Sequence, residues 1–137
     1  MNLAGLTGEG LLQHWSEIEP LISEAMVKTG ADADIDTSDI LEWCKSGAMQ
    51  CWVAHEDGEI VAAAVTEILV YPKRKVLGIP YLGARKQTIR GWKKFDKVLR
   101  EFAKENDCSA WRGGGREGWV KLFRPDRQWV QFEINVR

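Results

Sequence analysis

The sequence is poor in the side chains that build metal sites and disulfide frameworks. Its 137 residues include three cysteines and two histidines. The cysteines are odd in number, widely spaced and beside apolar residues, so they predict buried thiols rather than disulfides or a CxxC metal site. The histidines lie far apart without HxxxH spacing, which argues against zinc. We therefore expect no metal site.

Long apolar runs are missing too. No segment approaches the ~20 apolar residues of a membrane span, and the start, MNLAGLTGEGLL, lacks the basic and apolar regions of a signal peptide. We therefore expect no membrane contact and a cytoplasmic location. With only four prolines, 45% hydrophobic and 28% charged residues, the chain has a globular composition. Its length predicts a single domain over residues 1–137.

The net charge of −1 hides an uneven distribution. Residues 1–71 are strongly acidic, with only Lys28 and Lys45 opposing the carboxylates. Residues 72–100 are strongly basic, with Asp96 as their single acid. This asymmetry predicts either an anionic ligand or partner at the middle segment, or acidic and basic faces that complement each other within one fold or between subunits. Both alternatives are open at this point.

Apolar periodicity predicts two helices early in the chain. Between residues 11 and 28 apolar side chains recur every three or four residues, the period of one helical face. Pro20 lies inside this run, so it predicts either two pieces or a kinked helix. Gly30 ends the run, and a polar loop leads to a second helix over 38–45.

The middle of the chain predicts three consecutive antiparallel strands. The runs QCWVAH and IVAAAVTEILVY flank Asp57-Gly58, a dipeptide that favours the positive φ of a tight hairpin. After Pro72 and the basic link KRK, the run VLGIPYLG supplies the third strand.

The second half alternates between helix and strand. An apolar stripe over 89–103 predicts a long helix, and the short apolar run 108–111 predicts a strand parallel to the third one. Residues 119–123 suit a short helix ended by Pro125. Residues 129–136 alternate apolar and polar side chains, which predicts a final strand with one solvated face. The order helix, helix, strand, strand, strand, helix, strand, helix, strand predicts an α/β fold with a mixed sheet flanked by helices.

This order resembles the GNAT (acyl-CoA N-acyltransferase) superfamily over about residues 10 to 137. The likeness is carried by the DG hairpin, by VLGIPYLGARKQTIRGWKKFDKVLREFAKENDC as strand, loop and long helix, and by GREGWVKLF followed by RQWVQFEI. The combination of LVYP, AKENDC and GREGW is also similar to small GNAT-like proteins of bacteriophages and prophages. The resemblance implies a GNAT-like central sheet and, for the phage type, a place in the host cytoplasm or the virion.

The resemblance also implies where acetyl-CoA would bind. In the superfamily its pyrophosphate lies on backbone N–H groups at the start of the long helix, in a loop of pattern [RQ]xxGx[GA], where glycines let the backbone approach phosphate oxygens. Starting that pattern at Arg85 or Gln87 leaves no glycine at its glycine positions here. The loop is therefore degenerate, although its basic side chains still attract phosphate. The cofactor-binding candidates are Gly83, Ala84, Arg85, Lys86, Gln87, Thr88 and Arg90.

Acyl transfer from a thioester needs a proton donor for the thiolate and a base for the amine. The resemblance implies a donor tyrosine on the helix after the fifth superfamily strand, but Phe123 stands at that position and has no proton to give. Glu67, a carboxylate in an otherwise apolar strand, is the candidate catalytic base, since burial would raise its pKa. The alternative is that Glu67 is an outward-facing residue of an alternating strand.

The stretch WRGGGREGW joins the predicted short strand to the short helix. Its glycines either let the backbone leave the sheet sharply, which we favour, or form an anion nest between Arg112 and Arg116. If Gly114 holds a positive φ, alanine at that position should destabilise the fold.

The long helix carries a continuous basic face. The overall acidity and the absence of a recognisable reading motif argue against nucleic acid, so we expect a protein partner or a second copy of the chain, bound through acidic and basic faces. The candidates for anion or partner binding are Lys93, Lys94, Lys97, Arg112 and Arg116.

Two hypotheses about function follow. The first is a phage- or prophage-type GNAT-fold protein with a degenerate acetyl-CoA loop, an interaction or assembly component without acetyltransferase activity and without a required cofactor. The alternative is an active acetyl-CoA-dependent N-acetyltransferase with a divergent cofactor loop.

Overall fold

A five-stranded mixed sheet runs through the protein in the order β1-β2-β3-β4-β5. The structure, a computed structural model, describes residues 2–85, 92–114 and 117–136. The first four strands pair antiparallel, and β5 pairs parallel with β4. The predicted α/β class with a mixed sheet is therefore confirmed. The strands are β1 (Asn2–Leu6), β2 (Gln50–Glu56), β3 (Glu59–Val70), β4 (Lys75–Ala84) and β5 (Cys108–Gly113).

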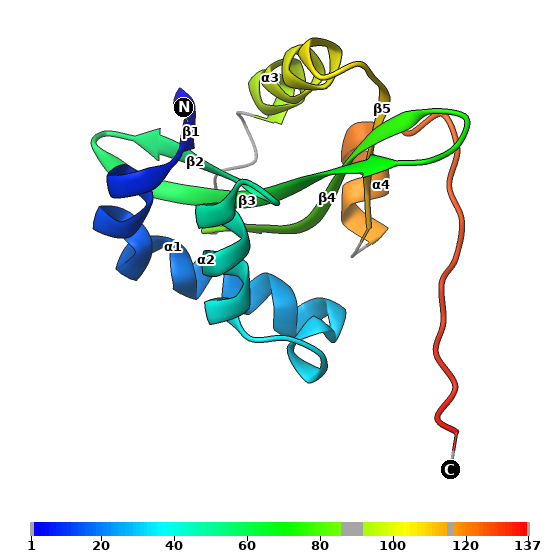
Figure 1. The fold of residues 1–137 in the computed structure, drawn as a ribbon, viewed down its shortest axis with the longest axis horizontal. Coiled ribbons are helices and arrows are strands. Elements are labelled where there is room, and N and C mark those ends of the chain that lie inside the picture. Colours follow the sequence, from blue (N-terminus) through cyan, green and yellow to red (C-terminus); the bar gives the residue numbers. More distant parts are fainter. Residues whose placement is uncertain (1, 86–91, 115–116, 137) are drawn as a thin grey trace.

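Helices cover both faces of this sheet (Figure 1). The helices are α1 (Gly8–Thr29), α2 (Thr37–Ser46), α3 (Trp92–Glu105) and α4 (Glu117–Phe123), with a 3-10 turn at Ala31–Ala33. α1 and α2 pack on one face, where Ile18 and Ile40 join Val65 in the core. α3 packs on the other face, where Phe95 joins Leu77. In the described residues no helix is both long and apolar enough to cross a membrane.

Local signals in the sequence place several element ends correctly. Asp57 and Gly58 have φ of 52° and 79°, so the β2-β3 hairpin forms through the predicted positive-φ turn. Gly30 ends α1 in the left-handed conformation, with φ of 82°. Pro20 lies inside a single helix, so it does not divide α1 into two pieces.

The two ends of the chain differ from the predicted order. β1 was not predicted, because NLAGL is short and contains Gly5; it forms as an edge strand paired with β2. The prediction of a final strand over residues 129–136 is wrong. Residues 129–136 have no strand assignment, and Figure 1 shows them running away from the body. Alternation marks a segment able to pair, but a strand forms only where a partner backbone is present.

The three cysteines are free and buried, as the sequence predicts. Burial raises the pKa of the Cys44 thiol to about 11. Burial, with a smaller contribution from Cys44, raises the pKa of Cys51 to about 12. Both thiols are therefore protonated and unreactive at neutral pH.

Two glycine positions have opposite surroundings. A Cβ on Gly83 would lie 2.1 Å from the backbone oxygen of Leu21, so β4 and α1 approach closely only because residue 83 has no side chain. Gly114 is not among the positive-φ residues, and a Cβ there would meet nothing within 4 Å. The condition under which alanine at 114 would destabilise the fold is therefore not met.

We predict that Gly83→Ala destabilises the protein by about 1–3 kcal/mol or more, because α1 must move away from β4 to admit the methyl group. Gly114→Ala is the matched control and should change stability by less than about 0.5 kcal/mol. Urea unfolding followed by circular dichroism measures both. Equal stability of the two variants would show that α1 does not touch β4 at this point.

Candidate functional site

A β-bulge at Pro80 shapes the centre of the sheet. In the β3-β4 register Val65 faces Tyr81 and Glu67 faces Gly78. Two β4 residues, Ile79 and Pro80, therefore stand opposite Thr66 alone. Proline has no backbone N–H to donate to a ladder, and a bulge is one of the few places where a strand tolerates it.

The bulge brings Tyr81 to the same face of the sheet as Glu67. Side chains alternate along a regular strand, so without the extra residue Tyr81 and Gly78 would lie on opposite faces. With it, Tyr81 packs against the core beneath α1 and α2. Gly78 supplies space, since a Cβ there would lie 3.4 Å from Cγ of Glu67.

The environment of Tyr81 holds its phenol protonated. Burial raises the pKa of Tyr81 above its ordinary value of 10.0, and the negative charges of Glu67 and Asp34 raise it further. A phenol of this kind is a proton donor at neutral pH. The structure thus places an acid and a carboxylate together in a half-buried site.

Glu67 lines a small pocket of about 270 Å³ together with Trp43, Ala48 and Met49. The side chain is half-buried, so it is not simply a solvated residue on an alternating strand. A carboxylate beside an indole and a thioether is suited to bind an amine or ammonium group.

The β4-β5 ladder ends beside the bulge, where β5 itself ends at Gly113. Their parallel ladder ends at the pair Ile79 and Gly113, whereas β4 continues to Ala84. Within the described residues, β4 beyond Pro80 therefore has no strand on its β5 side. Open α/β sheets bind ligands at the carboxyl ends of parallel strands, and an unpaired strand edge offers backbone groups to an extended ligand.

The predicted cofactor-binding residues are only partly described. Gly83 faces α1 and Ala84 pairs with Ala62, so both have structural roles in β4. The backbone N–H of Arg85 donates to Val61 at 2.9 Å, and its exposed guanidinium lies 3.3 Å from Glu59. Four further candidates lie outside the described residues: Lys86, Gln87, Thr88 and Arg90.

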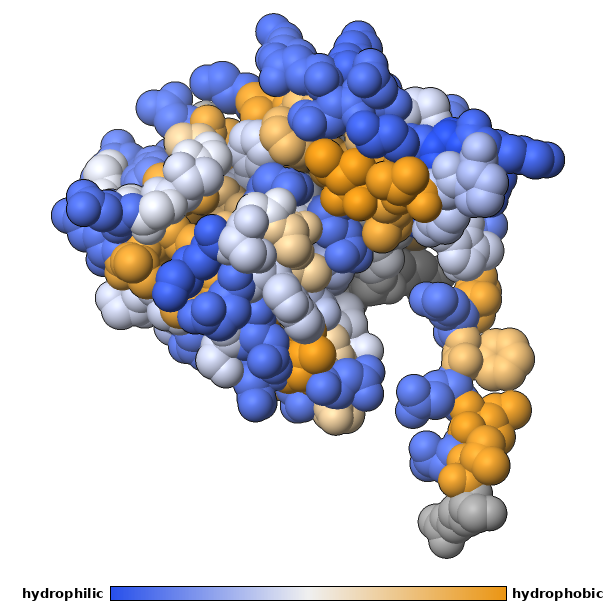
Figure 2. Space-filling model, in the orientation of Figure 1, coloured by the Kyte–Doolittle hydropathy of each residue, from blue (hydrophilic) through white to orange (hydrophobic). Residues whose placement is uncertain are grey.

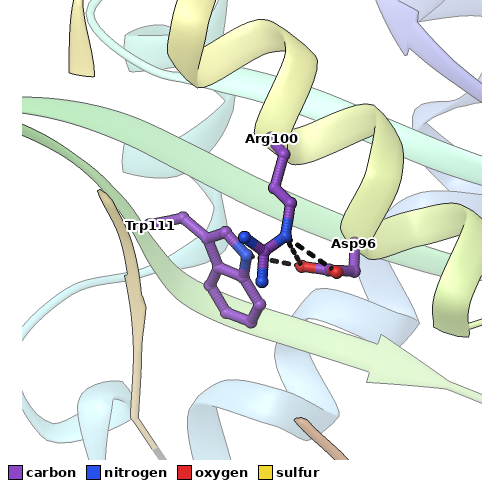
Figure 3. A network of polar contacts seen from close by, with 3 residues as sticks. All are labelled: Asp96, Arg100 and Trp111. Carbon is purple, nitrogen blue, oxygen red and sulfur yellow. Dashed lines mark hydrogen bonds and ion pairs between the residues drawn. The ribbon is translucent and has the colours of Figure 1, made fainter. Parts of the chain in front are cut away.

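A polar network joins α3 to β5 (Figure 3). Asp96 accepts a hydrogen bond from the indole N–H of Trp111 at 2.7 Å. The same carboxylate accepts hydrogen bonds from Nε of Arg100, at 3.0 and 2.9 Å. The one acid of the basic segment therefore fixes the position of the helix on the fifth strand.

The basic candidates do not form one surface. Lys93, Lys94 and Lys97 are exposed on α3, where Figure 2 shows a hydrophilic surface. Arg112 instead donates a hydrogen bond to the hydroxyl of Tyr71 at 2.9 Å. It lines a different pocket, of about 480 Å³, together with Tyr71, Pro72, Lys73, Arg74 and Arg127. Arg116 lies outside the described residues.

In the portion of the chain that the structure describes, no three His, Cys, Asp or Glu side chains are grouped as a metal site requires.

Several solved acetyltransferases share this architecture. An aminoglycoside acetyltransferase from an uncultured soil metagenomic sample matches with a TM-score of 0.76 and 18% identity, over 99% of this chain and 98% of that chain. Ribosomal-protein-alanine N-acetyltransferase from Brucella melitensis matches with a TM-score of 0.69 and 17% identity, over 99% and 100%. A predicted acetyltransferase from Clostridium acetobutylicum, crystallised with acetyl-CoA, matches with a TM-score of 0.67 and 13% identity, over 96% and 95%.

The chain has the GNAT fold. No protein-family model matches the sequence, and no curated protein does either. At these identities the structural likeness establishes the fold alone. The neighbours named above come from bacteria and a soil sample, so they give the phage origin no support.

Tyr81 is the site residue that the sequence reasoning missed. It lies on a predicted strand, whereas the resemblance implies a donor tyrosine on the helix after the fifth superfamily strand. The available signal was Pro80, since a proline inside a central strand predicts a bulge and a change of face. Phe123, on α4, packs edge-on against Trp111, with ring centroids 5.0 Å apart. Its side chain has no proton to donate.

We predict that Asp96→Ala lowers the free energy of unfolding by about 1–3 kcal/mol, because the partly buried indole N–H of Trp111 loses its acceptor. Lys97→Ala, on the exposed side of the same helix, is the control and should cost less than about 0.5 kcal/mol. Thermal and urea unfolding measure both. An Asp96→Ala variant as stable as the wild type would mean that the network does not hold α3 on β5.

We predict that Glu67→Gln lowers the pKa of Tyr81 while leaving it above the ordinary value, because burial is the larger cause. Glu56→Gln, at the exposed end of β2, should leave that pKa unchanged. Carbon-13 NMR of ring-labelled tyrosine measures the titration, with Tyr71→Phe assigning the second resonance. No response to Glu67→Gln would show that the carboxylate does not face the phenol.

Proposed function

We propose that this protein is an acyl-CoA-dependent N-acyltransferase that uses Glu67 as the base and Tyr81 as the acid. The observation that supports the proposal most is their place on one face of the sheet, through the bulge at Pro80, beside the end of the β4-β5 ladder. The GNAT fold of the acetyltransferase neighbours is consistent with this activity.

The two residues match the proton movements of the reaction. An acceptor amine is an ammonium ion at neutral pH, so it must lose a proton to attack a thioester carbonyl. The carboxylate of Glu67 accepts that proton. The hydroxyl of Tyr81, kept protonated by its raised pKa, donates a proton to the departing sulfur.

The pocket beside Glu67 supports a small amine-bearing group as the acceptor. Its volume of about 270 Å³ is slightly below the about 300 Å³ at which the usual range of ligand pockets begins. Trp43 and Glu67 provide an aromatic face and a negative charge, which together attract a cation. We therefore propose that the acceptor is the primary amine of a larger molecule, with only its end group enclosed.

Acetyl-CoA would supply the activated acyl group in this scheme. Within the described residues, the unpaired edge of β4 beyond Pro80 offers backbone hydrogen-bonding groups to its extended chain. This edge fits such a donor.

A second proposal is a GNAT-fold protein that binds partners without acetylating them. It is supported by the packing of Phe123 against Trp111, which leaves the usual donor position without a proton, and by the absence of glycine from the expected loop positions. The interaction and virion roles expected from the sequence belong to this second proposal.

Acetyl-CoA binding and thiol release separate the two proposals. We expect millimolar acetyl-CoA to raise the melting temperature, and a panel of polyamines, aminoglycosides and amino-terminal alanine peptides to include an acceptor that releases free CoA. Glu67→Gln and Tyr81→Phe should each lower kcat about 10²–10⁴-fold while retaining the thermal shift.

Glu56→Gln serves as the control for charge loss at a distance and should keep full activity. If acetyl-CoA produces no thermal shift and no amine gives thiol release, the catalytic proposal fails and the partner-binding one stands. If release occurs but both site variants keep full activity, the assignment of Glu67 and Tyr81 is wrong.

A further inference from the structure

A basic pocket of about 480 Å³ lies where the turn between β3 and β4 meets β5 and the residues after α4. Ligand pockets usually enclose about 300–1,000 Å³, so this one is large enough for a ligand group. It is lined by Tyr71, Pro72, Lys73, Arg74, Arg112 and Arg127. Four of these six residues are cations and none is an acid. The catalytic proposal gives this pocket no role.

The four cations of this pocket lack carboxylate partners. Within residues 2–85, 92–114 and 117–136, the ion pairs that acids form all involve other basic side chains. A concave site with charges of one sign attracts ligands of the opposite sign. Arginine suits phosphate in particular, because its planar guanidinium donates two parallel hydrogen bonds to phosphate oxygens. The pocket therefore favours a phosphate group as its ligand.

Trp129 holds two of these guanidinium groups in one place. The guanidinium carbon of Arg112 lies 5.0 Å from the centre of the indole, and that of Arg127 lies 5.5 Å from it. Nη1 of Arg112 also donates a hydrogen bond to the hydroxyl of Tyr71 at 2.9 Å. A guanidinium has five N–H donors, so others are left for a ligand. Two like charges beside the same ring repel each other, and an anion bound to both would offset that repulsion.

The pocket and Glu67 share one face of the sheet. Glu67 stands opposite Gly78 in the β3-β4 ladder, and Gly78 stands opposite Arg112 in the β4-β5 ladder. Tyr71 lies four residues after Glu67, and an even number of positions along an extended chain returns to the same face. The hydrogen bond between Tyr71 and Arg112 agrees with this placement. The candidate base and the basic pocket are therefore open to one ligand.

The distance between Glu67 and the pocket sets the length of such a ligand. Four residues of an extended strand span roughly 13 Å. The half-buried side chain of Leu69 lies between the two ends on the same face. A molecule laid along β3 would place an amine at Glu67, cross Leu69 and place a phosphate between Arg112 and Arg127.

We propose that the acceptor of the acyl transfer carries a phosphate group at the end remote from its amine, and that Arg112 and Arg127 bind this phosphate. The inference rests on the proposed function, because only a catalytic Glu67 needs an amine beside it. It narrows the acceptor from any primary amine to one with a phosphate roughly 13 Å away. Arg112 and Arg127 then select the substrate without taking part in proton transfer.

Binding of inorganic pyrophosphate, in the absence of acetyl-CoA, tests the pocket by itself. Isothermal titration calorimetry measures the affinity. We expect Arg112→Gln with Arg127→Gln to weaken binding at least about tenfold, because charge-assisted hydrogen bonds to phosphate are lost. Arg127→Gln alone, outside every helix and strand that the structure describes, should weaken it by a smaller factor without disturbing the fold.

Lys28→Gln with Lys104→Gln is the matched control, since it removes the same charge from exposed helix positions. This variant should bind pyrophosphate as the wild type does. Equal affinity in the wild type and all of the variants, or no binding to the wild type, would overturn the inference whether or not the protein is an acyltransferase.

Peptides that begin with alanine act as rulers for the spacing. Phosphoserine and serine are compared at position five, which four extended residues separate from the amine. With acetyl-CoA as donor, we expect kcat/KM to be about 10–100-fold higher for the phosphorylated peptide. Arg112→Gln with Arg127→Gln should abolish this preference, whereas the lysine control should keep it.

An aminoalkyl phosphate of equal span distinguishes the sources of the phosphate. It lacks a peptide backbone, so a higher kcat/KM than that of the phosphopeptide would identify a small phosphorylated amine as the acceptor. A lower value would identify a phosphorylated peptide.

The outcomes separate this inference from the function on which it rests. Acetylation without any preference for phosphorylated acceptors would overturn the inference and leave the proposed function standing. If no amine releases CoA, the proposed function fails, and pyrophosphate binding would then show an anion site without a role in acyl transfer.

Discussion

Pro80 cannot donate a backbone hydrogen bond, yet it stands in β4, which has a neighbouring strand on each side. The sheet accommodates it by a bulge against β3 and by ending the ladder with β5 at the residue before it. Both responses shape the candidate site. The bulge brings Tyr81 to the face of Glu67, and the ended ladder leaves the β4 edge open. The bulge at Pro80 thus places the candidate acid and base on one face, beside the end of the β4-β5 ladder.

The residues around the bulge hold it in one arrangement. Thr66, which faces it, is fully buried and its hydroxyl bridges Trp52 and Gln50, accepting from the indole and donating to the amide oxygen, at 2.9 Å each. Gly78 and Gly83 bracket the bulge along β4, and their missing side chains admit Glu67 and α1 respectively. On the far side, the Asp96 and Trp111 hydrogen bond keeps α3 on β5. Tyr81 and Glu67 therefore meet within a packed framework.

Most of the fold could be predicted from the sequence because its signals are local. The Asp57-Gly58 turn, the glycine that ends α1 and the apolar stripe of α3 each specify an element through nearby residues. β1 could not be predicted in this way, since NLAGL forms a strand only because β2 lies beside it. Residues 129–136 show the converse. Their apolar and polar side chains alternate as clearly as those of any strand, but among the described residues no partner backbone pairs with them.

The candidate site was harder to predict because it depends on a register. Glu67 stood out as a carboxylate in an apolar strand, and the structure adds its pocket beside Trp43. The face of Tyr81 depends on Ile79 and Pro80 standing together opposite Thr66, and Pro80 is the sequence signal for that bulge. The basic helix and the Gly113-Gly114 turn drew attention through composition. However, Arg112 lines the pocket beside Tyr71, whereas the α3 lysines lie on an exposed helix surface, and neither of these glycines has a positive φ.

The most direct test of this account is a crystal structure of the protein with acetyl-CoA. The account predicts an extended donor along β4 beyond Pro80, with its thioester directed toward the face that carries Glu67 and Tyr81. A β4-β5 ladder that continues past Ile79, or a donor bound only in the pocket of Arg112 and Arg127, would contradict it.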